Sequence, residues 1–129
     1  MNEKNTKYLL ETYPGLYSQY KLPMNQTCMC WGFECGDGWF DIVNNLSKKI
    51  AEIAPNVEAV QVKEKFGGLR FYINGGNDDV YTLINNAEDL SYKTCEDCGS
   101  VENVTQTRGW IHTLCQLCLI EYEQNKKKI

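Results

Sequence analysis

The sequence predicts an α+β fold: a small body of two amphipathic helices and a β-hairpin, followed by a cysteine-rich module. Three observations lead to this prediction. Apolar residues recur at helical spacing in two segments, residues 37–53 and 79–92. Between these segments, apolar and polar residues alternate on both sides of a Gly-Gly pair. Near the C-terminal end, four cysteines form two C-x2-C pairs.

The first third of the chain precedes the clear helical pattern. Residues 3–12 are expected to form a short helix that ends at the sequence YPG, and residues 16–36 an irregular, partly buried connection. From Asp37 the helical pattern is regular until the sequence APN ends it. We expect Asp37 to cap this helix, because its carboxylate can accept bonds from the free amides of the first turn. The apolar face comprises Trp39, Ile42, Val43, Leu46, Ile50 and Ile53.

The segment from residue 57 to residue 74 predicts two strands joined by a tight connection. Gly67 and Gly68 supply the backbone freedom that such a connection needs. The alternating apolar residues are Val60 and Val62 in the first strand and Leu69, Phe71 and Ile73 in the second.

A second helix is expected from about Asp79 to Tyr92, after the helix-breaking sequence NGGNDD. Its apolar face comprises Val80, Leu83, Ile84, Ala87 and Leu90. We therefore divide the chain into an α/β body at residues 1–92 and a cysteine module at residues 93–129. The link between them is short, so the two parts are expected to contact each other.

The cysteine content favours metal binding over disulfide bonds. The chain has seven cysteines, an odd number, and its first residues lack the apolar segment of an export signal. We therefore expect an unexported protein of a reducing cytosol, where thiols stay free. The net charge of −4 disfavours nucleic acid on average, and no apolar run is long enough to cross a membrane.

The two C-x2-C pairs have the spacing of a zinc site. Two such pairs can complete a tetrahedron around one structural Zn²⁺, and four thiolates leave no open position for a catalytic water. Between the pairs the sequence predicts a hairpin that turns near Arg108, and a helix begins at the second pair. This order resembles the treble-clef class of zinc modules, with a zinc ribbon as the alternative. The expected ligands are Cys95, Cys98, Cys115 and Cys118.

The other chemically capable residues admit two interpretations each. Cys28, Cys30 and Cys35 are either buried free thiols or part of a second metal site, and the aromatic residues around them form either core or a binding patch. Glu34, Asp37 and the single histidine, His112, are the residues that a metal-dependent nuclease could use. With one histidine and no clear catalytic group, we expect a protein that is not an enzyme and has no small-molecule substrate.

The sequence KEKFGGLR places three cations beside a Gly-Gly turn. Lys63, Lys65 and Arg70 flank the turn and Phe66, so its amides and the cations could hold a phosphate. The alternative is a solvated hairpin whose charged edges discourage sheet association.

Three pieces of the chain, WGFECGDGWF, VKEKFGGLRFYI and the paired cysteine module, are together similar to small uncharacterised proteins of bacteriophages and prophages. The resemblance implies a phage or prophage accessory protein that acts in the bacterial host cytoplasm, where it binds a host or phage protein and inhibits or redirects it. The expected partner-binding residues are Lys63, Lys65, Phe66, Arg70, Trp31 and Phe33. The alternative function is nucleic-acid binding, to which Arg108 would also contribute.

Overall fold

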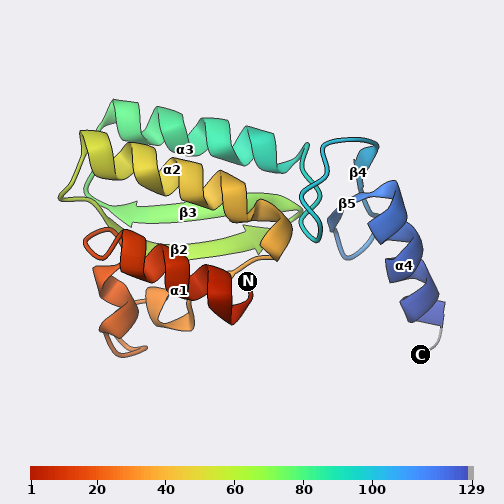
Figure 1. Ribbon diagram of the computed structural model, residues 1–129, viewed down its shortest axis with the longest axis horizontal. Coiled ribbons are helices and arrows are strands. Elements are labelled where there is room, and N and C mark those ends of the chain that lie inside the picture. Colours follow the sequence, from red (N-terminus) through yellow and green to blue (C-terminus); the bar gives the residue numbers. More distant parts are fainter. Residues whose placement is uncertain (128–129) are drawn as a thin grey trace.

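The computed structural model describes residues 1–127, which form four α-helices, a three-stranded sheet and a two-stranded sheet (Figure 1). The α+β fold class is therefore confirmed. The helices are α1 (Glu3–Thr12), α2 (Phe40–Ile53), α3 (Asp78–Ser91) and α4 (Gln116–Lys127). The strands are β1 (Phe33–Glu34), β2 (Glu58–Lys65), β3 (Gly68–Asn74), β4 (Val104–Gln106) and β5 (Thr113–Cys115).

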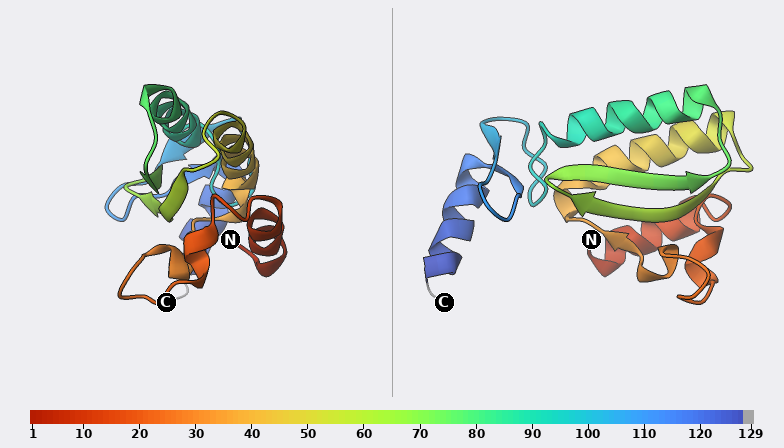
Figure 2. Two further views of the ribbon diagram at one scale, coloured as in Figure 1. Left: turned by 90° about the vertical axis from the view of Figure 1, so that its left-hand side faces the viewer. Right: turned by 180° about the vertical axis from the view of Figure 1, so that it is seen from behind.

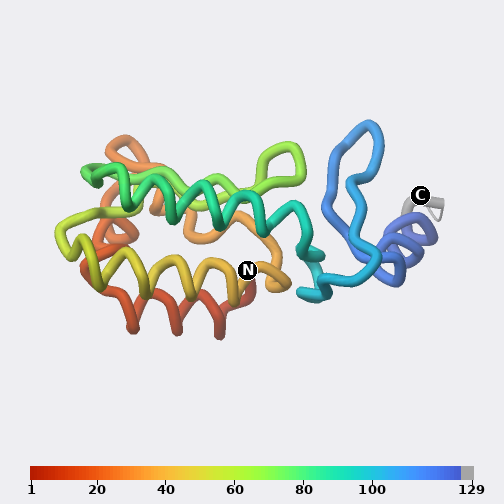
Figure 3. Tube along the Cα trace, turned by 90° about the horizontal axis from the view of Figure 1, so that it is seen from above, coloured from red at the N-terminus to blue at the C-terminus, as the bar shows by residue number. Residues whose placement is uncertain are grey.

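The helices of the body lie along the larger sheet. Helices α2 and α3 run side by side in opposite directions, and α1 lies on the other side of α2 (Figures 2 and 3). Leu9 joins α1 to the core, and Trp39 is fully buried just before α2. The predicted apolar faces are confirmed except at their C-terminal ends, where Ile53 and Leu90 are exposed.

The hairpin of β2 and β3 is antiparallel and pairs Lys65 with Gly68. Its two turn residues are Phe66 and Gly67, with φ angles of 54° and 84°, as a two-residue hairpin with both central residues in the left-handed region requires. The expected turn at Gly67 and Gly68 is thus wrong by one residue. Gly68 belongs to β3, where the ring of Tyr92 leaves no room for a Cβ atom.

Two features of the sheet are absent from the sequence pattern. Strand β1 lies within the segment expected to be irregular, and it pairs in parallel with β2, Phe33 opposite Val62. A β-bulge interrupts β2 at Val60, so that Ala59 and Val62 are the buried residues and Val60 is only half-buried. The predicted alternation of Val60 with Val62 is therefore wrong at Val60.

Asp37 does not cap α2. A 3-10 turn from Asp37 to Trp39 precedes the helix, and α2 has no side-chain cap. The Asp37 carboxylate instead accepts hydrogen bonds from the backbone amide of Asn2 at 2.8 Å and the side-chain amide of Asn5 at 3.1 Å. The carboxylate therefore fixes the start of α1 against the loop before α2.

The cysteine module lies at one end of the body and contacts it directly (Figure 1). On one side, the backbone amide of Gly38 donates to the carbonyl of Glu96 at 2.7 Å, and the Trp39 indole N–H donates to the carbonyl of Thr94 at 2.9 Å. On the other side, the hydroxyl of Thr113 donates to the carbonyl of Gly67 at 2.5 Å. The two parts therefore contact each other, as expected, while the division at residue 92 stays a prediction.

Candidate metal centre

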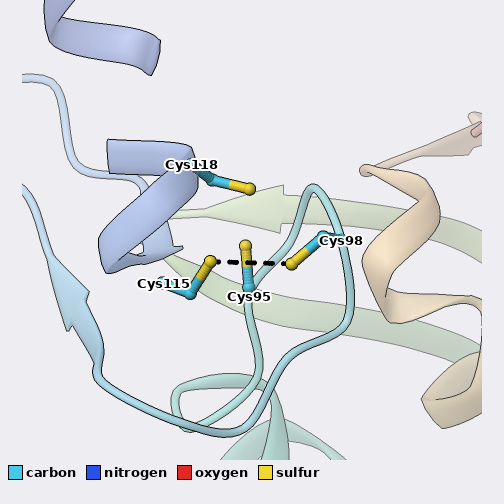
Figure 4. Close-up of side chains that lie close together, drawn as sticks. All are labelled: Cys95, Cys98, Cys115 and Cys118. Atoms are coloured by element: carbon cyan, nitrogen blue, oxygen red, sulfur yellow. Dashed lines mark hydrogen bonds between the residues drawn. The ribbon is translucent and has the colours of Figure 1, made fainter. Parts of the chain in front are cut away.

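Four cysteine sulfurs converge on one point (Figure 4). Their Sγ atoms all lie within 4.8 Å of one another, and the Sγ atoms of Cys98 and Cys115 are 3.6 Å apart. A disulfide would require about 2.05 Å, so these are free thiols arranged around a common centre. The four residues are the predicted ligands, Cys95, Cys98, Cys115 and Cys118.

The local structure explains why the sulfurs meet. The first pair lies in a tight knuckle, which is closed by hydrogen bonds from the Gly99 amide to the Cys95 carbonyl at 2.9 Å and from the Cys95 amide to the Ser100 carbonyl at 2.8 Å. Cys115 ends β5, and Cys118 lies in the first turn of α4. The order of knuckle, hairpin and ligand-bearing helix matches the predicted treble-clef-like arrangement and differs from a zinc ribbon, which has no such helix.

The sulfurs differ in how readily they ionise. The backbone amide of Cys118 donates to the sulfur of Cys115 and lowers the pKa of that thiol to about 7. Burial is the main cause that raises the pKa of the Cys118 thiol, and the neighbouring thiols raise it further. A metal cation at the centre would stabilise all four thiolates at once, because each bond replaces a proton. The arrangement can therefore hold one metal ion and leaves it no open position.

A carboxylate that sequence reasoning missed joins the knuckle to the body. Glu96 sits between the two cysteines of the knuckle, and its Oε2 atom accepts a hydrogen bond from the Gly36 amide at 2.9 Å. Burial raises the pKa of the Glu96 carboxyl to about 7. No sequence pattern indicates this contact, because it joins residues 60 positions apart. Glu96 thus connects the cysteine module, called the metal module from here on, to the segment WGFECGDGWF.

The remaining cysteines do not gather around a second centre. Within residues 1–127, the four cysteines described above are the one group of at least three metal-ligating side chains that come together. Cys28 is exposed, Cys30 is half-buried and Cys35 is buried. Burial, and next the charge of Glu96, raise the pKa of the Cys35 thiol to about 12.

The three residues considered for a nuclease have other surroundings. Glu34 is exposed on β1. The Asp37 carboxylate accepts hydrogen bonds from Asn2 and Asn5 at the start of α1. The ring of His112 lies against that of Tyr122, with centroids 5.0 Å apart. His112 is not part of the metal-ligating group.

The predicted partner-binding residues separate into four groups: Phe33, Arg70, Trp31, and the three residues Lys63, Lys65 and Phe66. Phe33 is 5 % exposed and contacts the ring of Tyr17 edge-on in the core, so the prediction that it binds a partner is wrong. Arg70 is held by Glu88, with Nη1 and Oε1 2.9 Å apart. Trp31 is 61 % exposed and remains available.

Lys63, Lys65 and Phe66 line a groove between the body and the metal module. The groove has a volume of about 290 Å³, and its other wall is the tip of the β4–β5 hairpin, with Trp110 and Ile111. Sequence reasoning missed Trp110, although a tryptophan next to the turn sequence Arg-Gly was a usable signal, because a large aromatic residue at a hairpin tip has no core to fill.

No helix within residues 1–127 combines the length and the apolar character needed to span a membrane. Comparison of the chain with protein-family models, with curated proteins and with solved structures found no match.

Proposed function

We propose that this protein is a non-enzymatic module, folded around one zinc ion, that binds another protein. The observation that carries the proposal is the closed cluster of four cysteine sulfurs. A tetrahedron with Zn–S bonds of about 2.3 Å has edges of about 3.8 Å. The separation of 3.6 Å between the sulfurs of Cys98 and Cys115 agrees with that edge. Four thiolates are typical of a structural site, in which metal binding contributes to folding.

Exposed apolar side chains on the segment from residue 20 to residue 31 support the protein-binding part of the proposal. Trp31 is 61 % exposed and Met24 is 71 % exposed. The segment folds back on itself, since the backbone at Gly32 approaches the ring of Tyr20. Large apolar side chains that are exposed, without a role in the core, are typical of interaction surfaces. We refer to the exposed side chains of this segment, Tyr20, Leu22, Met24 and Trp31, as the Trp31 patch.

The cellular location and the kind of partner that we propose come from the resemblance to phage and prophage proteins. The protein would act in the bacterial cytoplasm and mask a surface of a host or phage protein without turnover. Its net charge of −4 would favour a partner with a basic surface, because opposite charges accelerate association.

The proposal is tested in two measurements. Elemental analysis of the purified protein is expected to give one zinc per chain, and a different metal, or far less than one per chain, would contradict the zinc part. A tagged pull-down from nuclease-treated bacterial lysate is expected to retain one protein near stoichiometrically. Trp31→Ala should abolish that retention, whereas Tyr81→Ala, an exposed aromatic on α3, should not. Equal retention by both variants would contradict the role of the Trp31 patch.

A further inference from the structure

Two aromatic side chains stand exposed at the groove between the body and the metal module. Phe66 is 66 % exposed on one wall, and Trp110 is 78 % exposed on the other. Neither residue contributes to the core of its own part of the protein. The groove contains no residue of the Trp31 patch, so the two surfaces consist of different residues.

Phe66 occupies a backbone conformation that disfavours it. Its φ angle of 54° lies in the left-handed region, where a bulky side chain is a genuine outlier and where Asn or Gly is the usual turn residue. Strain of this kind is typical of functional positions. Because Phe66 is exposed, burial does not offset the strain. The strained aromatic therefore points to a ligand.

The tip of the β4–β5 hairpin holds Trp110 in place by its backbone. The hydroxyl of Thr107 donates to the Trp110 carbonyl at 2.8 Å and accepts from the His112 amide at 2.8 Å. The Thr107 amide donates to the His112 carbonyl at 2.9 Å and closes the loop. These bonds fix the backbone that carries the indole, and they leave its face open.

The charges around the groove are mainly positive, in contrast to the whole chain. Lys63 and Lys65 line it, and Arg108 precedes the Gly109–Trp110 wall. Among the described residues, none of these three cations forms an ion pair. The one carboxylate in the groove, that of Glu64, accepts a hydrogen bond from the Gly67 amide at 2.7 Å. The ammonium of Lys65 lies 5.6 Å from the centre of the Phe66 ring.

We propose that this groove binds single-stranded nucleic acid, with bases stacked on Phe66 and Trp110 and phosphates beside Lys63, Lys65 and Arg108. Exposed aromatic faces that accept bases, beside cations that follow the backbone, are the elements of non-sequence-specific single-strand binding. An apolar peptide would not require the cations. An acidic peptide would not require two flat aromatic faces. The activity adds to the proposed protein binding and does not depend on it.

The test uses the full-length, metal-loaded protein and a fluorescently labelled oligothymidylate about 15 nucleotides long, a length that covers a typical single-strand site. Fluorescence anisotropy is expected to show binding at about 50 mM salt that weakens steeply by about 200 mM, because released counterions oppose it. Trp110→Ala should weaken binding roughly tenfold or more. Lys65→Ala should lower the slope of log affinity against log salt by about one.

Phe66→Asn separates a ligand-binding role from a structural role. Asn adopts the left-handed conformation more readily than Phe, so the urea midpoint of unfolding of this variant should stay the same or rise. Its binding of oligothymidylate should nevertheless be weaker, because the aromatic ring is gone. Tyr81→Ala, which removes an exposed aromatic of α3 outside the groove, serves as the matched control and should bind the oligonucleotide as the unmodified protein does. Three outcomes would overturn the proposal. The first is no anisotropy change at low salt, and the second is binding that survives both Trp110→Ala and Phe66→Asn. The third is a labelled oligoglutamate peptide that binds the groove and is not displaced by oligothymidylate.

Discussion

Gly38→Ala tests the contact between the body and the metal module. A Cβ atom built on Gly38 would lie 2.6 Å from the carbonyl oxygen of Glu96 and still closer to that of Cys95. Both oxygens belong to the knuckle backbone, which cannot rotate away as a side chain can. The knuckle must therefore move, or the loop before α2 must. We expect this substitution to separate the two surfaces locally.

The expected loss has two parts. Overpacking of a well-filled site costs about 1–3 kcal/mol. Separation would also weaken the hydrogen bonds from the Gly38 amide to Glu96 and from the Trp39 indole to Thr94, each with a net contribution of about 1 kcal/mol. We therefore expect Gly38→Ala to lower the free energy of unfolding by about 3–5 kcal/mol.

The assay is urea unfolding of the metal-loaded protein at one fixed zinc concentration, followed by tryptophan fluorescence. We expect Trp39 to give most of the signal change, because it is buried whereas Trp31 and Trp110 are exposed. Gly15→Ala is the matched control, because a Cβ atom there would lie 3.9 Å from the Pro55 carbonyl oxygen, an ordinary contact. The control should be neutral or stabilised by up to about 1 kcal/mol. A Gly38→Ala variant that unfolds within about 1 kcal/mol of the control would refute the reasoning.

Three further predictions concern the metal module and the remaining thiols. Glu96→Ala should destabilise the fold by about 1–3 kcal/mol in urea unfolding, because the Gly36 amide loses its acceptor, whereas Glu96→Gln keeps an acceptor and should be near neutral. Cys118→Ser should reduce the bound zinc well below one per chain, and elemental analysis that still finds one would exclude Cys118 as a ligand. In the native protein at pH 8, an alkylating reagent should modify exposed Cys28 far faster than Cys35, whose raised pKa of about 12 leaves only about one thiol in ten thousand ionised. Mass spectrometry of timed samples checks this, and equal rates would show that Cys35 is not protected; its rate should rise with pH as the thiolate forms.

Some parts of the structure could be predicted because the sequence that forms them has a regular local spacing of residues. The faces of α2 and α3 follow from apolar residues three and four positions apart, and the cluster of four thiols follows from the spacing of its cysteines. Strand β1 was not predictable, because it consists of two residues whose pairing partners lie about 30 positions further along the chain. Its register with β2 is decided by tertiary packing of Phe33, which no local period encodes.

Long-range polar contacts were equally inaccessible from the sequence. Asp37 has the residue type and the position of a helix cap, and the cap role was the reasonable expectation. In the structure, the Asp37 carboxylate instead accepts hydrogen bonds from Asn2 and Asn5 at the start of α1. Glu96 and Trp110 carry no motif of their own. Their neighbours are known only once the two parts of the chain are placed together.

If the four cysteines bind zinc, the contacts at Gly38 and Gly67 would make the stability of the body depend on the supply of that metal. If the body and the module unfold in one cooperative step, each tenfold rise in free zinc above the dissociation constant adds about 1.4 kcal/mol to the stability of the whole chain. The segment KEKFGGLR, which ligates no metal, would then share this dependence through the Thr113–Gly67 hydrogen bond. Zinc availability in the cell would thus set how much of the chain presents a folded Phe66 turn to any ligand.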